Sequence, residues 1–165
     1  MSFHFIEEKV EDALASVIIS ETGGALAGNS ISGGSLDGFF LYKGFSLEDM
    51  DFPALLVTAV STRPNEPRID AASGNQMVTV RVQVMGHKGD ATTTRSAHAA
   101  VAGAVRDVLY IDDDVEVGTG LSVLMNAAGV ADLTVMKTFP SASTRGVQGG
   151  LIVTETSVDV KCYPN

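Results

Sequence analysis

The sequence has a single cysteine, no tryptophan and no long apolar run. One cysteine, Cys162, excludes an internal disulfide and any metal site that needs several thiolates. No stretch approaches the roughly 20 apolar residues of a transmembrane helix. The first residues, MSFHFIEEKVEDALASVII, are acidic where a signal peptide is basic. We therefore expect a soluble protein that is made in a cytoplasm and is not bound to a membrane.

Basic residues are also scarce. The chain has 11 Lys and Arg against 20 Asp and Glu, which gives a net charge of -9 and an isoelectric point near 4.6. Tight binding to nucleic acid requires a basic face, so the composition disfavours a DNA-binding module. With 165 residues, 45% of them hydrophobic, the chain is long enough for a single domain, 1–165, with a sizeable core.

The motifs of common catalytic sites are missing as well. The three histidines, His4, His87 and His98, do not occur in an HExxH spacing, and no Gly-x-Ser-x-Gly elbow is present. The glycines of segment 20–38 are not followed by Gly-Lys-Ser/Thr, so they do not form a phosphate-binding loop. Cys162 fits a small core residue better than a reactive thiol. We therefore predict no catalytic residues, no cofactor and no metal, and we expect that the protein is not an enzyme.

Asp112–Asp114 leave one alternative open. Three consecutive carboxylates could bind a cation and, together with His87, could serve a small metal-dependent enzyme. The glycine and the downstream glutamate of an EF-hand loop are absent at the required spacing. The other interpretation is an acidic, solvated turn that follows a helix.

Residues 76–110 contain the clearest structural pattern. Val78, Val80, Val82 and Val84 alternate with mostly polar residues, which is typical of a strand with one buried face. A glycine-containing turn follows. Apolar residues then recur every three or four positions, as in an amphipathic helix; they are Ala97, Ala100, Val101, Ala104, Val105, Val108 and Leu109. This strand and helix are expected to form the scaffold of the domain.

The other patterns predict one more long helix, one short helix and four strands. The long helix spans 5–19, and its carboxylates, Glu7, Glu8, Glu11 and Asp12, are expected to lie away from its apolar side. The strands are expected at 39–45, 54–62, 130–139 and 151–163, and the short helix at 120–128. The last two strands should form an antiparallel hairpin.

Three segments between these elements are expected to be loops. Segment 20–38 is rich in glycine and predicts a flexible surface loop, and segments 63–75 and 140–150 predict projecting loops. Segment 63–75 connects two strong strands, and its mixed charge suits contacts with a partner; a solvated hairpin tip is the other interpretation. The predicted interface residues are Arg63, Glu66, Arg68, Asp70 and Arg145.

Taken in this order, the elements resemble those of the tail terminator proteins of long-tailed bacteriophages, which cap the finished tail tube. The matching features are the acidic helix EEKVEDALASVI, the strand FPALLVTAV, the strand VTVRVQVMG with the helix RSAHAAVAGAVRDVL, and the closing hairpin FPSASTRGVQGGLIVTETSVDVKCY. The likeness is one of pattern and order from about residue 5 to 163. Segments 20–38 and 112–116 depart from the family's pattern.

The resemblance implies an α+β fold in which helices pack on one mainly antiparallel or mixed sheet and long hairpin loops project. It also implies a structural protein of the virion tail and neck, assembled in the host cytoplasm. Its partners would be further copies in a ring, expected to be a hexamer, the tail tube protein, and a head-completion protein. DNA would pass through the lumen without specific binding, because six copies at -9 would carry roughly -54. A head-completion or connector-adaptor protein of the neck is the alternative role.

Overall fold

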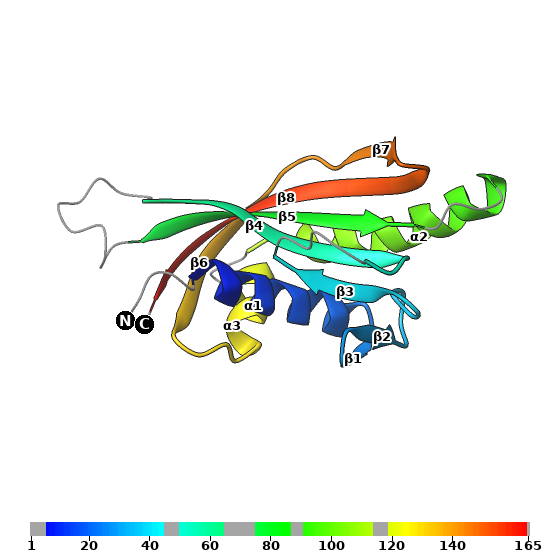
Figure 1. Cartoon of the computed structure of the whole chain (residues 1–165). Coiled ribbons are helices and arrows are strands. Elements are labelled where there is room, and N and C mark those ends of the chain that lie inside the picture. The colour runs from blue at the N-terminus through cyan, green and yellow to red at the C-terminus, as the bar shows by residue number, and fades with distance from the viewer. Residues whose placement is uncertain (1–5, 45–49, 65–74, 87–90, 114–118, 165) are drawn as a thin grey trace.

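The computed structural model describes residues 6–44, 50–64, 75–86, 91–113 and 119–164. These residues form three helices and one sheet of eight strands (Figure 1). In chain order the elements are α1 (Ile6–Glu21), β1 (Ala25–Ala27), β2 (Ser30–Ser32), β3 (Phe40–Lys43), β4 (Ala54–Pro64), β5 (Gln76–Met85), α2 (Ala91–Leu109), α3 (Leu121–Ala127), β6 (Leu133–Pro140), β7 (Thr144–Gln148) and β8 (Leu151–Pro164). None of these helices is long and apolar enough to cross a membrane.

The sheet is mixed and mainly antiparallel. Its strands follow the order β1-β2-β3-β4-β5-β8-β6, and β7 also pairs with β8. Only β3 and β4 run parallel among the described pairs. β6 and β7 follow one another along the same side of β8, since Pro140 is the partner of Val158 and Thr144 is the partner of Glu155. The expected α+β fold is confirmed.

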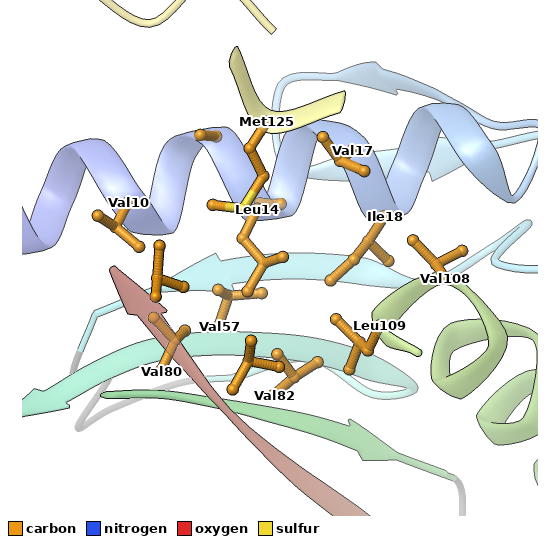
Figure 2. Close-up of a cluster of buried hydrophobic side chains, with 14 of the residues drawn as sticks. Val10, Leu14, Val17, Ile18, Val57, Val80, Val82, Val108, Leu109 and Met125 are labelled. Carbon is orange, nitrogen blue, oxygen red and sulfur yellow. The ribbon is translucent and has the colours of Figure 1, made fainter. Parts of the chain in front are cut away.

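One face of the sheet carries the hydrophobic core. The predicted alternation of β5 is confirmed, because every second residue from Gln76 to Val84 is buried. Figure 2 shows Val57 and Val82 beneath Leu14 of α1, with Leu109 of α2 beside them. All three helices contribute to this one cluster of buried residues. They therefore cover the same face of the sheet.

Two of the predicted loops contain strands. Segment 20–38 includes the hairpin of β1 and β2, in which Ala27 pairs with Ser30. Segment 140–150 includes β7, which turns into β8 through Gly149 and Gly150. These glycines have positive φ angles of 57° and 81°, as the two-residue turn of a tight hairpin requires. The prediction of loops without strands was wrong here, because all residues of β1 and β7 are exposed and give no apolar alternation.

The two strands that flank segment 63–75 reach into it. β4 continues to Pro64 and β5 begins at Gln76, so Arg63 belongs to a strand and not to a loop. The middle of the segment, 65–74, lies outside the described residues. The prediction of a projecting loop therefore stays a prediction for those residues.

Glu11 is buried, although its position on α1 predicted exposure. Its side chain is 6% exposed, and its Oε2 accepts the backbone N–H of Ala59 at 2.7 Å. The register of β4 against β5 shifts between Ala59 and Ser61, so Glu11 supplies an acceptor at a bulge in the ladder. Burial raises the pKa of Glu11 above its usual 4.5; the Ala59 hydrogen bond opposes this rise, and nearby carboxylates, Asp12 first, add to it.

We expect Glu11→Gln to stabilise the protein at neutral pH, because the amide oxygen still accepts the Ala59 N–H without a buried charge. Since the folded-state pKa is raised, the stabilising contribution of Glu11 is complete below about 4.5 and is lost as pH rises through the folded-state pKa. The difference in the free energy of unfolding between the Gln variant and the wild type should therefore disappear at acidic pH. Urea denaturation of both proteins across this pH range measures it.

Glu11→Leu is the matched variant without an acceptor. It leaves the buried Ala59 N–H without a partner and should cost about 1–3 kcal/mol at neutral pH. If Glu11→Gln were as destabilised as Glu11→Leu at neutral pH, the carboxylate itself would be required at the bulge, and our interpretation would be wrong.

Candidate interaction surface

One side of α2 carries small residues between two arginines. Five residues of α2 recur at helical spacing and therefore lie on the same side of the helix: Arg95, Ala99, Ala102, Gly103 and Arg106. Both arginines are exposed. Arg106 follows Arg95 by eleven positions, which corresponds to about 16 Å along the helix axis.

β7 lies opposite this side of α2 and contributes a third arginine. Arg145 pairs with Thr154 of β8, and both residues line a hollow of about 280 Å³ whose other wall is α2. An adjoining hollow of about 270 Å³ lies between Arg145 and the residues from Arg95 to Ala99. We name the two hollows together the arginine groove. Its helix side runs from Arg95 to Arg106, and its strand side consists of 143–145 with Thr154.

The three groove arginines have no acidic partner among the described residues, a property that they share with Lys137 and Lys161. Four ion pairs occupy cations elsewhere, at N–O distances from 2.7 to 3.8 Å: Lys9–Asp132, Lys43–Asp12, Arg63–Asp159 and Arg81–Glu155. Within the part of the chain that the structure describes, the groove arginines form no ion pair, and no Asp or Glu lines the groove. The groove is thus a local concentration of positive charge on a chain whose net charge is -9.

His98 fixes α2 against the floor of this groove. Its side chain is 4% exposed, and its Nε2 lies 2.8 Å from Thr154 Oγ1. A Cβ atom on Gly86 would lie only 3.0 Å from the other ring nitrogen, Nδ1, so the ring packs closely against the end of β5. Burial lowers the pKa of His98, and the positive charge of Arg145 lowers it further. The ring is therefore neutral at pH 7 and positions the helix.

The structure describes two of the predicted interface residues, Arg63 and Arg145, and places them apart. Arg63 lies near the end of β4, with Nη2 3.8 Å from Asp159 Oδ2 and Nη1 3.4 Å from Thr79 Oγ1. Arg63 pairs with Met77 of β5, whereas Arg145 is level with Val84 of β5, because both are partners of Thr154 in β8. The two arginines are therefore seven residues apart along the strand direction, a distance of about 23 Å. The remaining three predicted residues lie outside the described part of the chain: Glu66, Arg68 and Asp70.

Arg63 belongs to a second surface, the sheet face opposite the helices, which we name the polar face. Its central residues are Thr79, Arg81 and Gln83 of β5 and Glu155, Ser157 and Asp159 of β8. All six are only partly exposed. Positive and negative side chains alternate across it, as in the pair Arg81 Nε to Glu155 Oε1 at 2.7 Å. No described helix covers this face.

Asp113 has a structural role that the sequence did not reveal. Its Oδ1 accepts the N–H and the hydroxyl of Ser122, both at 2.9 Å, and its Oδ2 accepts the N–H of Thr138 at 2.8 Å and the hydroxyl at 3.2 Å. Ser122 is in the first turn of α3, so the carboxylate caps that helix and ties it to β6. The interpretation of a solvated turn was wrong for this residue.

The described residues contain no group of three side chains that could hold a metal ion. In the metal-enzyme alternative, Asp112 is exposed, and Asp114 and His87 lie outside the described part. Cys162 is completely buried, and burial raises the pKa of its thiol to about 12, with a further rise from Glu7. Its prediction as a core residue is confirmed, and its thiol stays protonated at neutral pH.

No protein-family model matches the sequence, and no curated protein matches it either. The function of the chain is therefore inferred from its fold and its surfaces.

Proposed function

We propose that this chain is the subunit of a ring that ends the tail of a long-tailed bacteriophage and joins the tail to the head. The sequence and the fold both support the proposal. The order of elements along the sequence resembles that of tail terminator proteins, and the chain has the α+β fold that this resemblance implies. Its net charge of -9 also suits a channel through which DNA passes without binding.

The one-sided covering of the sheet is the observation on which the proposal depends most. The described helices pack on a single face, so the polar face is left without a covering layer. Among the described strands, β7 in addition pairs only with β8, and all five of its residues are exposed. An open, exposed edge strand is a surface on which another chain can pair. A ring subunit needs such separate surfaces, because each neighbour and each stacked ring contacts a different side of it.

Native mass spectrometry of the purified chain, alone and mixed with the tube protein of the same particle, tests the proposal. We expect a closed ring to form at least in the presence of tube protein. A chain that stays monomeric in both samples and never binds the tube would contradict the proposal. Labelling the chain in intact particles separates the two neck roles: a position beside the tube supports the terminator, and one beside the portal supports the head-completion protein.

The double variant Arg63→Glu with Arg68→Glu tests whether segment 63–75 takes part in assembly. Arg63 is exposed and its ion pair with Asp159 lies at the surface, so the folded monomer should change in stability by no more than about 0.5–1 kcal/mol. Binding to the tube or to neighbouring copies should be impaired. Lys43→Glu with Lys137→Glu makes the same change in net charge elsewhere and should assemble normally. Normal assembly of the Arg63 and Arg68 variant would favour the solvated hairpin tip.

A further inference from the structure

We propose that the arginine groove is the site at which the neighbouring copy of this chain docks, through carboxylates on an extended acidic segment. The inference deepens the proposed ring and rests on it, because it identifies which surface of one subunit receives the next. It is independent of Arg63, which lies at the other end of the sheet.

The chemistry of the groove selects a carboxylate. A guanidinium presents paired N–H groups that match the two oxygens of a carboxylate, and such pairs are stronger than neutral hydrogen bonds. Arg145 faces α2 across the groove, and Arg95 and Arg106 stand at the two ends of the helix side. The small side chains between them, Ala99 and Gly103, let a backbone approach α2 closely.

The length of the groove fits an extended segment. About 16 Å separates Arg95 from Arg106 along the helix axis, which equals about five residues of extended chain. A segment with carboxylates near both ends could therefore reach both arginines at once. β7 forms the opposite wall and pairs only with β8 within the described sheet, so its outer edge can supply main-chain hydrogen bonds to the same segment.

The balance of charge favours a second copy of the chain as the occupant. Subunits of charge -9 repel one another, so a contact between them needs local complementarity. The groove offers three arginines without an acidic partner among the described residues, and the chain has 20 carboxylates against 11 basic residues. The basic groove of one copy would contact the acidic segment of the next, so the two contacting surfaces differ. Repeated head-to-tail contacts of this kind can close into a ring. Nucleic acid is disfavoured as an occupant because the whole chain would repel it.

Photo-cross-linking of the purified full-length chain tests this inference. p-Benzoylphenylalanine replaces Ser96 on the helix side of the groove in one variant and Thr144 on the strand side in a second, so that a folding defect in one leaves the other informative. We expect irradiation at ring-forming concentration to give a cross-linked dimer from either position. Peptide mapping should place the far end of the cross-link in a segment that carries Asp or Glu.

Paired substitutions then test the role of the arginines. Arg95→Gln with Arg145→Gln should reduce the yield of cross-linked dimer about tenfold or more. Lys43→Gln with Lys137→Gln removes the same charge from exposed positions outside the groove and should leave the yield unchanged. Raising the salt concentration should weaken the cross-link of the unsubstituted groove, since salt screens exposed charges.

The outcomes separate this inference from the proposed function. A ring that assembles while neither position gives a cross-linked dimer would overturn the groove and leave the ring intact. The groove would also be overturned if the far end of the cross-link lay in a segment without Asp or Glu. The same holds if the arginine substitutions left the yield of cross-linked dimer unchanged. A groove-dependent dimer that never binds tube protein would instead support the groove and contradict the tail role.

Discussion

Val82→Asp is expected to abolish folding. Val82 is 1% exposed and pairs in the sheet with Val57 of β4 and Thr156 of β8, beneath α1 and α2 (Figure 2). A carboxylate there would have no partner in the hydrophobic cluster, and an uncompensated buried charge costs about 3–5 kcal/mol. The lost burial of the valine adds about 1.5–3 kcal/mol. The total approaches the whole stability of an ordinary domain, which is about 5–15 kcal/mol.

Far-ultraviolet circular dichroism and urea denaturation measure this effect. Val82→Thr is the control of equal shape, and it should remain folded with a smaller loss of stability, because a hydroxyl is far less costly to bury than a charge. Gln83→Lys places a charge on the next residue, opposite Glu155 on the polar face, and should have little effect. A cooperative transition for Val82→Asp near that of the wild type would show that the core does not depend on this position.

The core of the fold could be predicted because burial leaves a periodic signature. The alternating valines of β5 face this cluster, as does the carboxyl-terminal part of the predicted repeat of α2, namely Val101, Val105, Val108 and Leu109, and both patterns were recognisable from spacing alone. The prediction was wrong for Ala97 and Ala100, which are exposed. The last strand was equally clear, since Val158, Val160 and Cys162 are completely buried on one side of β8. These elements depend on hydrophobic contacts, which the sequence records directly.

The strands β1 and β7 could not be predicted by the same reasoning. They are held by backbone hydrogen bonds to β2 and β8, which any residue except proline can form. All their side chains are exposed, so no apolar alternation marks them. The glycines that suggested loops in fact form the turns of these hairpins, as Gly149 and Gly150 do.

The candidate site was recognisable only in part for a related reason. Arg95 and Arg106 on one side of α2 could have been found from their helical spacing, with small residues between them. Their opposing residue, Arg145, was predicted as part of a loop, so the groove could not be assembled before β7 was known. Glu11 and Asp113 likewise have roles set by distant backbone groups, the N–H of Ala59 and that of Thr138. Spacing in the sequence contains no information about such contacts.

Asp113→Ala is expected to destabilise the protein by about 3 kcal/mol. The substitution removes the acceptor of two backbone N–H groups, those of Ser122 and Thr138, and of both side-chain hydroxyls. A buried donor left without an acceptor costs about 1–3 kcal/mol, and bonds to a charged acceptor lie at the upper end of that range. Ser122 and Thr138 are each 6% exposed, so water replaces the lost acceptor poorly. The contact between α3 and β6 should therefore weaken, although the Asn126 side chain still exchanges two hydrogen bonds with the Val135 backbone.

The neighbouring residue provides the matched control. Asp112 is exposed, so Asp112→Ala should change the free energy of unfolding by no more than about 0.5 kcal/mol. Asp113→Asn retains one of the two acceptor oxygens and should fall between the two alanine variants. Urea denaturation gives the three values, and hydrogen exchange at Thr138 shows whether the loss begins at β6. If Asp112→Ala and Asp113→Ala lowered the free energy of unfolding equally, the hydrogen bonds of Asp113 would not explain the loss. The two residues share only their negative charge, so the charge would then be the cause.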